Sequence, residues 1–314
     1  MKHIDFLSAT ERGAIAAYSL VGRGLEHDAD QAAVTAMRGA LNQLDIKGKI
    51  VIGEGERDEA PMLYIGEEVG VDGGVPTDIA VDPLEGTTLC ARGDRGSLSV
   101  LAAGEAGKFL HAPDVYMNKI AVGPKARDAI HIERSVEENC RNVADALSKN
   151  LSDLCVMVLD RPRHEKIIRN LRDLGSKVIL IRDGDVSAAI LTCIEDSGID
   201  MMMGVGGSPE GVLAAAALKC LGGNIQGILQ FNKDEEKERA FRLGITEFHK
   251  VYSLEDMVSG DVVFCATGVT SGDLLQGISI QGSVLKTHSL VMRSKDYSLS
   301  RITTEYPKER WIHG

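Results

Sequence analysis

The segment LCVMVLDRPRHEKIIRNLRDLGSKVILI, residues 154–181, contains an alternation of strand and helix patterns that indicates the fold class. Residues 154–159 form an apolar run typical of a buried strand, residues 164–174 have helical spacing and end at Gly175, and residues 178–181 are apolar again. A strand, a helix and a second strand in this order indicate a βαβ unit. The alternation continues through an expected helix at 186–194, strand at 201–205, helix at 209–221 and strand at 261–266. The sequence therefore predicts an α/β fold.

The first part of the chain has a different order of elements, with α+β character. Two expected helices, the second starting near Asp30, come before the expected strands. Those strands are expected at residues 49–53, 78–84, 97–103, 108–112 and 119–122. Because the pattern changes near residue 130, we expect two α/β regions, residues 1–130 and residues 131–314. Residues 283–306 indicate further strands, and the sequence leaves open which sheet they join.

Composition limits the classes of partner. The 314 residues include 35 Lys and Arg against 46 Asp and Glu, for a net charge of −11 without a basic block, so a nucleic-acid surface is not expected. The N-terminus MKHIDFLSATERGA has no signal-peptide core, and no apolar run reaches membrane-spanning length. The 6 cysteines form no CxxC pair and favour reduced, mostly buried thiols. We therefore expect a cytoplasmic protein with neither a membrane nor a nucleic-acid partner.

Carboxylates gather where two expected strands end. Glu54, Glu56 and Asp58 follow the strand at 49–53, and Asp82 and Glu85 end the strand at 78–84. Neighbouring carboxylates repel one another and lose hydration when buried, so such a group is tolerated mainly when cations share it. Carboxylate oxygens without His or Cys ligands suit Mg²⁺ or Mn²⁺. The alternative is a set of exposed loop acids, and we favour the metal site because tight Gly and Pro turns flank the group.

The hexapeptide Asp82-Pro-Leu-Glu-Gly-Thr87 gives the strongest chemical signal. Its two carboxylates are separated by a Pro turn, Gly86 permits a close backbone approach, and Thr87 offers a hydroxyl group beside them. Cations that bridge a phosphate and a water lower the pKa of that water, and a threonine hydroxyl can hold the water in line for attack. A plain Asp-Pro turn explains Asp82 and Pro83, but it does not explain Glu85 together with Thr87.

These residues also resemble a known family. DPLEGT resembles the Asp-Pro-[Leu/Ile]-[Asp/Glu]-Gly-[Ser/Thr] motif of the lithium-sensitive, metal-dependent phosphatase superfamily. VIGEGERDEAPMLYIGE at residues 51–67 narrows the resemblance to class II fructose-1,6-bisphosphatases. Further matching segments occur in the same order: APDVYMNKIAVGP, DRPRHEKII, DGDVSAAILTC, GVGGSPEGVLAAAALK and FCATGVTSGDLL. The resemblance covers nearly the whole chain and implies a layered α-β-α-β-α sugar-phosphatase fold.

The resemblance also implies the site residues. The metal ligands would be Asp30, Glu54, Asp82, Glu85 and Glu210. The substrate contacts would be Glu85, Gly86, Thr87, Tyr116, Arg161, Pro162, Arg163, Asp183, Gly184, Asp185 and Gly207. Thr87 would be catalytic, with Asp58 as its base partner. Residues 1–130 would thus be the metal-binding and catalytic region, and residues 131–314 the substrate-binding region.

Alternative roles exist for several of these residues. Asp30 sits at an expected helix start, where an N-cap is the alternative to a metal ligand. Arg161 and Arg163 follow a strand and suit a phosphate, with surface solubility as the alternative. Asp183 and Asp185 suit sugar hydroxyl groups or, alternatively, a turn around Gly184.

The helix at 209–221 gives its own expectations. Ser208 is expected as the N-cap, Pro209 in the first helical position and Gly222 at the end. Glu210 would then lie in the first turn, where the helix dipole alone is the alternative to metal binding.

The resemblance implies hydrolysis of the 1-phosphate of fructose 1,6-bisphosphate to fructose 6-phosphate in gluconeogenesis, by a homo-oligomer (dimer or tetramer) that needs Mg²⁺ or Mn²⁺. Sedoheptulose 1,7-bisphosphate as a second substrate, and another phosphatase activity of the superfamily, remain alternatives. A dinucleotide-dependent oxidoreductase is a rival reading, but Pro209 interrupts the GxGxxG pattern and no P-loop is present. A non-catalytic sugar-phosphate sensor is disfavoured because Thr87 and the acids are all in place.

Overall fold

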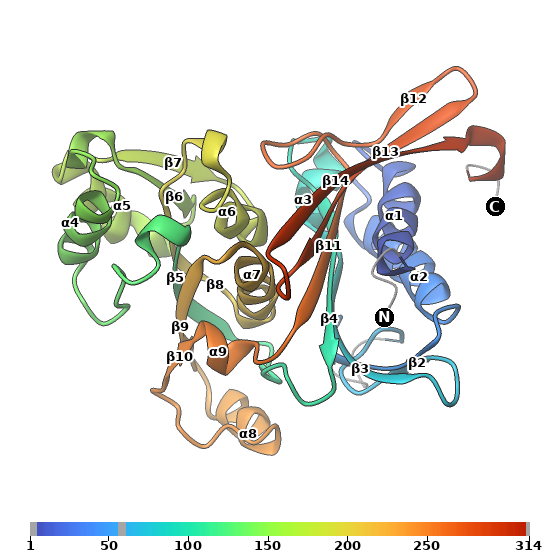
Figure 1. The fold of residues 1–314 in the computed structure, drawn as a ribbon, viewed down its shortest axis with the longest axis horizontal. Helices are drawn as coiled ribbons and strands as arrows, with labels where there is room; N and C mark the ends of the chain where they lie inside the picture. The colour runs from blue at the N-terminus through green and yellow to red at the C-terminus, as the bar shows by residue number, and fades with distance from the viewer. Residues whose placement is uncertain (1–4, 56–60, 312–314) are drawn as a thin grey trace. The chain divides into compact units, whose positions relative to one another are not determined.

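The computed structural model describes residues 5–55 and 61–311, and the chain divides into two compact units (Figure 1). Unit 1 comprises Met1–Lys108 and Gly260–Gly314, and unit 2 comprises Phe109–Ser259. This division differs from the regions 1–130 and 131–314 expected from the sequence, because the C-terminal part of the chain returns to unit 1. No helix in the described ranges is long and apolar enough to cross a membrane.

Unit 1 is built on an eight-stranded sheet, as far as the described residues show, in the order β12-β13-β11-β4-β3-β1-β2 with β14 beside β13. Strands β1 and β3 are parallel, and the other neighbours are antiparallel. The strands are β1 (Ile46–Ile52), β2 (Glu68–Gly70), β3 (Val75–Glu85), β4 (Leu98–Glu105), β11 (Val262–Gly268), β12 (Ser279–Gln281), β13 (Val284–Arg293) and β14 (Ser298–Pro307). The C-terminal strands, whose sheet the sequence left open, therefore belong to this sheet.

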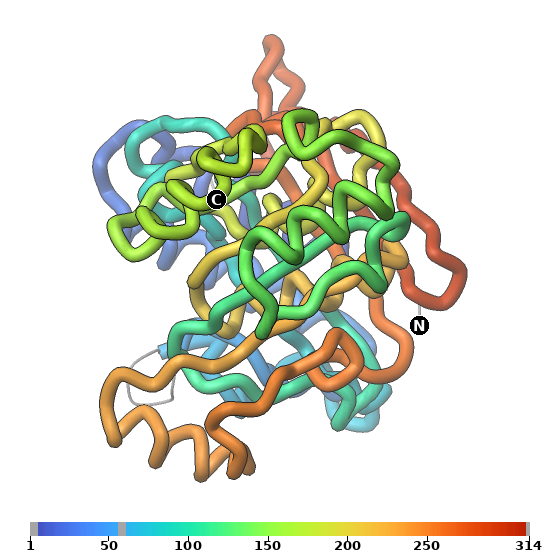
Figure 2. Tube along the Cα trace, turned by 90° about the vertical axis from the view of Figure 1, so that its left-hand side faces the viewer, coloured from blue at the N-terminus to red at the C-terminus, as the bar shows by residue number. Residues whose placement is uncertain are grey.

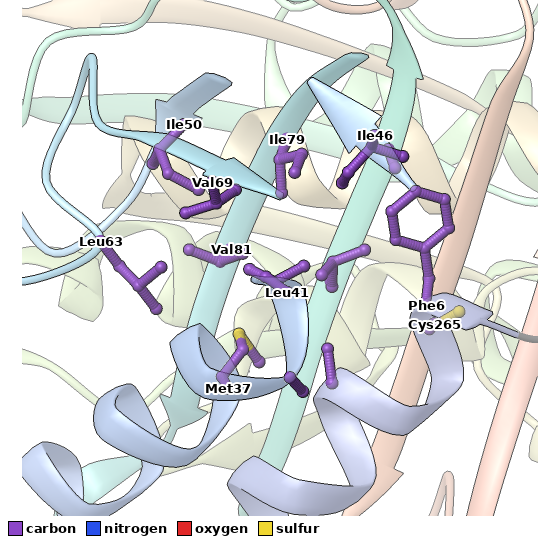
Figure 3. Close-up of a cluster of buried hydrophobic side chains, with 14 of the residues drawn as sticks. Phe6, Met37, Leu41, Ile46, Ile50, Leu63, Val69, Ile79, Val81 and Cys265 are labelled. Carbon is purple, nitrogen blue, oxygen red and sulfur yellow. The ribbon is translucent and has the colours of Figure 1, made fainter. Parts of the chain in front are cut away.

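Two helices, α1 (Asp5–Tyr18) and α2 (Glu26–Leu41), cover one face of the unit 1 sheet. In Figure 3, Phe6, Met37 and Leu41 lie on the same side of the strands as Ile79 and Val81, within one buried cluster. Because Met37 and Leu41 lie four residues apart, the helix presents both to the sheet. Each such side chain contributes about 1.5–3 kcal/mol when fully buried. The packing fixes α2, and hence Asp30 near its start, against the strands that carry the acids.

Unit 2 contains a six-stranded sheet, within the described ranges, in the order β10-β9-β5-β8-β6-β7. Strand β6 is parallel to both β7 and β8, which confirms the predicted βαβ unit, whereas β5 is antiparallel to β8 and β9. The strands are β5 (Tyr116–Val122), β6 (Cys155–Leu159), β7 (Lys177–Ile181), β8 (Met201–Gly207), β9 (Asn224–Gln230) and β10 (Val251–Ser253). The expected strand at 108–112 is wrong: only an isolated bridge joins Phe109 to Val258.

Helices cover both faces of the unit 2 sheet (Figures 1 and 2). Helices α4 (Val136–Ala146) and α5 (Glu165–Asp173) pack on one face, where Ile120 and Val122 of β5 join their buried cluster. Helices α6 (Asp185–Leu191) and α7 (Ser208–Leu221) lie on the other. Helices α8 (Asp234–Arg242) and α9 (Leu254–Met257) follow β9 and β10, respectively. Successive side chains of a strand point to opposite faces of the sheet, and Ile120 points toward α4 and α5. Lys119 therefore points toward the face that α7 covers.

Candidate active site

The hexapeptide DPLEGT of unit 1 forms a strand-to-helix junction. The pairing of β3 with β4 shifts register between Asp82 and Glu85, and Asp82 Oδ1 accepts a hydrogen bond from the Leu84 N–H at 3.1 Å. Gly86 has a φ of 75°, a left-handed conformation that favours glycine, and α3 (Thr87–Arg92) begins directly after it. The junction therefore places the buried Glu85 and the half-buried Thr87 on either side of one glycine.

Asp30 and Glu54 of unit 1 are in contact. Helix α2 begins at Glu26, so Asp30 lies inside the helix, and the N-cap role, the alternative to its expected role as a metal ligand, is wrong. Its carboxyl group is hydrogen-bonded to that of Glu54. Burial raises the pKa of Asp30, although the bond to Glu54 and the nearby His27 oppose that change. Two carboxyl groups this close can share a proton or a cation.

The expected metal ligands of unit 1 fit a hard divalent cation by their chemistry. Their donors are all carboxylate oxygens, and the Asp30–Glu54 contact places two of them together. Across residues 5–55 and 61–311, no three His, Cys, Asp or Glu side chains lie close enough to form a ready-made metal site. Asp58, expected to assist Thr87, lies outside the described residues.

Unit 2 brings three of the expected substrate contacts together. Tyr116, at the start of β5, is paired with Gly207 at the end of β8. The Arg163 guanidinium carbon lies 4.9 Å from the centre of the Tyr116 ring. Both Nε and Nη2 of Arg163 donate to the Val205 carbonyl, at 3.0 and 2.8 Å. Tyr116 is 44% exposed, so this group faces solvent and is available to a ligand.

A buried histidine that the sequence analysis did not single out holds the loop of Arg161, Pro162 and Arg163. His164 Nε2 accepts a hydrogen bond from the Val205 N–H at 2.7 Å, and Nδ1 lies 2.7 Å from the Leu159 carbonyl. Because Nε2 accepts, the ring proton sits on Nδ1 and is donated to Leu159. Desolvation lowers the pKa of His164, which favours this neutral form. The ring thus ties the end of β6 to β8 on either side of the arginine loop.

The remaining substrate candidates lie at the start of α6. Gly184 has a φ of 90° and precedes Asp185, the first residue of that helix. Asp183 Oδ1 accepts a hydrogen bond from the Gly184 N–H at 3.1 Å. This contact fits the alternative role of these residues in a turn around Gly184. Asp185, however, is buried in an ion pair with Lys119, a residue that the sequence analysis did not single out.

Glu210 lies in the first turn of α7, as expected, and Gly222 ends that helix. The expected Ser208 N-cap is wrong: the cap position belongs to Gly207, and Ser208 Oγ donates instead to the Pro113 carbonyl. Oxygen Oε2 of Glu210 is buried and accepts no hydrogen bond from any described residue. Burial, and then repulsion from Asp185, raise the pKa of Glu210 to about 7. A buried carboxylate oxygen without a donor is suited to a cation.

The comparisons with known proteins all point to one family. Residues 2–306 match the family described as "Bacterial fructose-1,6-bisphosphatase, glpX-encoded". The chain is 47% identical over 321 residues to the Escherichia coli (strain K12) protein named "Fructose-1,6-bisphosphatase 1 class 2", covering 98% of this chain and 95% of that protein. A Haemophilus influenzae protein named "Fructose-1,6-bisphosphatase class 2" is 45% identical over 313 residues, covering 95% and 94%.

A Synechococcus sp. (strain JA-2-3B'a(2-13)) protein is 44% identical over 331 residues, covering 98% of this chain and 95% of that protein. Its name is "D-fructose 1,6-bisphosphatase class 2/sedoheptulose 1,7-bisphosphatase". These matches span both units, together with the junction and arginine loop described above. The chain therefore belongs to the bacterial, glpX-encoded fructose-1,6-bisphosphatase family.

Proposed function

We propose that this phosphatase hydrolyses the 1-phosphate of fructose 1,6-bisphosphate to fructose 6-phosphate and phosphate, as a cytoplasmic step of gluconeogenesis. The observation that carries the proposal is the junction that places Glu85 and Thr87 on either side of Gly86, in a chain whose relatives are named fructose-1,6-bisphosphatases. The family match favours this reading over the oxidoreductase and over other phosphatases of the superfamily.

The carboxylates Asp30, Glu54, Asp82, Glu85 and Glu210 are the proposed ligands of Mg²⁺ or Mn²⁺. When bound, such cations neutralise charge on the phosphate and acidify water. The hydroxyl group of Thr87 orients the attacking water, and Asp58 accepts a proton from that hydroxyl. Glu85, Gly86 and Thr87 contact the phosphate that is cleaved.

The groups of unit 2 recognise the rest of the substrate. Arg161 and Arg163 bind the phosphate that is retained, because guanidinium groups match phosphate oxygens in pairs. Asp183 and Asp185 accept hydrogen bonds from sugar hydroxyl groups, and Tyr116, Pro162, Gly184 and Gly207 complete the surface around them.

Phosphate release measured across a panel of sugar phosphates tests the proposed activity. The panel contains fructose 1,6-bisphosphate, sedoheptulose 1,7-bisphosphate, inositol monophosphate and fructose 6-phosphate, each with Mg²⁺ and with Mn²⁺. We expect the highest kcat/KM with fructose 1,6-bisphosphate and fructose 6-phosphate as its product. A preference for inositol monophosphate, or no release from any bisphosphate, would contradict the proposal.

Sedoheptulose 1,7-bisphosphate is the second candidate substrate, because a relative 44% identical to this chain carries both activities in its name. The two substrates have the same phosphate arrangement and differ by one carbon in the sugar. Comparable kcat/KM values for the two would make the enzyme bifunctional, whereas a large difference would assign it to one of them.

Replacing both Arg161 and Arg163 with Ala should weaken recognition of the retained phosphate. Each hydrogen bond to a charged group contributes about 1.5–3 kcal/mol, so we expect KM for fructose 1,6-bisphosphate to rise about 100-fold or more. Turnover at saturating substrate should change far less, because these groups do not touch the reacting phosphate. Steady-state kinetics of the double variant measure both quantities.

A matched control exists on the neighbouring helix. Arg169 and Arg172 of α5 are exposed, and the double variant Arg169→Ala/Arg172→Ala removes the same charge from unit 2. We expect its KM to stay near that of the parent protein. An equal rise of KM in both double variants would mean that net charge, and not a specific phosphate contact, explains the effect.

A further inference from the structure

Strand β5 carries an ammonium group in the interior of unit 2. Lys119 is only 1% exposed and ranks among the largest fully buried side chains of the described residues. Its Nζ donates to Asp185 Oδ2 and, at 2.8 Å, to the carbonyl oxygen of Gly207. One side chain therefore links the first residue of α6 to the backbone that leads into α7.

The sequence around Lys119 leaves room for this contact. A Cβ atom added at Gly206 would overlap Asp185 Oδ2 and would lie 3.0 Å from Lys119 Nζ. A Cβ atom at Gly211 would lie 3.3 Å from Lys119 Cδ and 2.7 Å from Met117 Sδ. Glycines on β8 and α7 thus make the space in which the lysine stem and the Asp185 carboxylate meet.

Lys119 also acts electrostatically on two buried carboxylates, those of Asp185 and Glu210. Glu210 is affected by the negative charge of Asp185 and, in the opposite direction, by the positive charge of Lys119. Two carboxylates at the starts of α6 and α7 repel one another, and the ammonium group of Lys119 reduces the effect of that repulsion on Glu210. A buried ion pair is seldom a better source of stability than an apolar pair of equal volume, so stability alone is a weak reason for this arrangement.

We propose that Lys119 is a positioning residue of the sugar-binding site. Its ammonium group holds the Asp185 carboxylate in the orientation that accepts hydrogen bonds from the sugar, and it fixes the Gly207 carbonyl before the helix that carries Glu210. The inference rests on the proposed function, since it assigns Asp185 to the substrate.

A double-mutant cycle tests whether Lys119 acts through Asp185. The variants are Lys119→Met, which keeps the length of the stem, Asp185→Asn, and the two together. We expect Lys119→Met to raise KM for fructose 1,6-bisphosphate about 10- to 100-fold, the range for losing a hydrogen bond to a charged group. The double variant should have nearly the KM of Asp185→Asn alone, because residues that act as a unit are not additive.

A second readout does not need turnover. The dissociation constant of fructose 6-phosphate, measured by calorimetry, should rise in Lys119→Met and should show the same non-additivity. If Lys119→Met does not fold, Gly206→Ala replaces it: this variant keeps every charge but displaces Asp185, so KM should rise as well.

Lys149→Met is the matched control, because Lys149 forms a 2.6 Å ion pair with Asp200 elsewhere in unit 2. Its KM and its dissociation constant should match those of the parent protein. The inference would be overturned if KM were unchanged in Lys119→Met or in Gly206→Ala. It would also be overturned if the fold-changes in KM of Lys119→Met and Asp185→Asn multiplied in the double variant. If the parent protein releases no phosphate from fructose 1,6-bisphosphate, the proposed function fails, while the fructose 6-phosphate cycle still decides the role of Lys119.

Discussion

Thr87→Ala should fold, bind substrate and lose most of its turnover. Loss of one group that orients or transfers a proton typically costs about 10²–10⁴ in rate, and we expect kcat to fall within this range. The fold should tolerate the change, because Thr87 is the first residue of α3 and alanine is the best helix former. Steady-state kinetics, with thermal unfolding of the same preparation, measure both effects.

The conservative variant Thr87→Ser is the control for this prediction. Serine keeps the hydroxyl group and removes only a methyl group, so most of the turnover should remain. A Thr87→Ala variant with kcat near that of the parent protein would remove Thr87 from the mechanism. Equal losses in Ala and Ser variants would instead indicate that the methyl group and its packing matter.

Glu210→Gln should lose metal affinity and most of its turnover without losing stability. Oxygen Oε2 of Glu210 is buried and receives no hydrogen bond from the described residues, and the residue is close enough to Asp185 to be repelled by it. Glutamine has nearly the same shape but no charge, so it removes that repulsion and binds a divalent cation poorly. We expect at least a 100-fold fall in kcat and a melting temperature equal to or above that of the parent protein.

The competing explanation for Glu210 is the helix dipole alone. An acidic residue in an exposed first turn stabilises a helix by about 0.3–1 kcal/mol, so this explanation predicts a small loss of stability and normal activity. Metal titration and kinetics of Glu210→Gln distinguish the two. If the metal dependence and kcat of Glu210→Gln were both unchanged, Glu210 would have only a structural role in the helix.

The sequence predicted the elements of the fold better than their assembly. Apolar runs at 49–53, 78–84 and 154–159 became β1, β3 and β6, because their short length and the turn residues that flank them favour a strand over a helix. The sheet of residues 283–306 was not predictable in this way. Strand β13 pairs with β11 on one side and with β14 on the other, and these pairings depend on register over long stretches of chain.

The starts of α2 and α7 were not predictable from local capping residues. The second helix was expected to start near Asp30, and Ser208 was expected as an N-cap, yet α2 begins at Glu26 and Gly207 caps α7. An N-cap preference is a local signal of about 1 kcal/mol, which tertiary contacts readily outweigh. Ser208, for example, donates to Pro113, which is far away in the sequence.

Lys119 and His164 show what local patterns leave out. Lys119 stands in the run MNKIAV, where a strand pattern suggests burial but the charge suggests exposure. Its partner Asp185 is distant in the sequence, so only the folded chain reveals the pair. His164 follows Pro162 and Arg163, and this sequence is typical of a polar, exposed helix start. The His164 side chain is nevertheless buried, and it is hydrogen-bonded to the backbone of Leu159 and Val205. In both cases the burial of the residue was the missing information.

We propose that this chain hydrolyses fructose 1,6-bisphosphate with the help of divalent cations held by its carboxylates. The most direct measurement is phosphate release from fructose 1,6-bisphosphate by metal-stripped protein, before and after addition of Mg²⁺ or Mn²⁺. We expect no turnover in the presence of a chelator and recovery when metal is restored. Full turnover by metal-stripped, chelator-treated protein would contradict it, as would the absence of phosphate release with either metal.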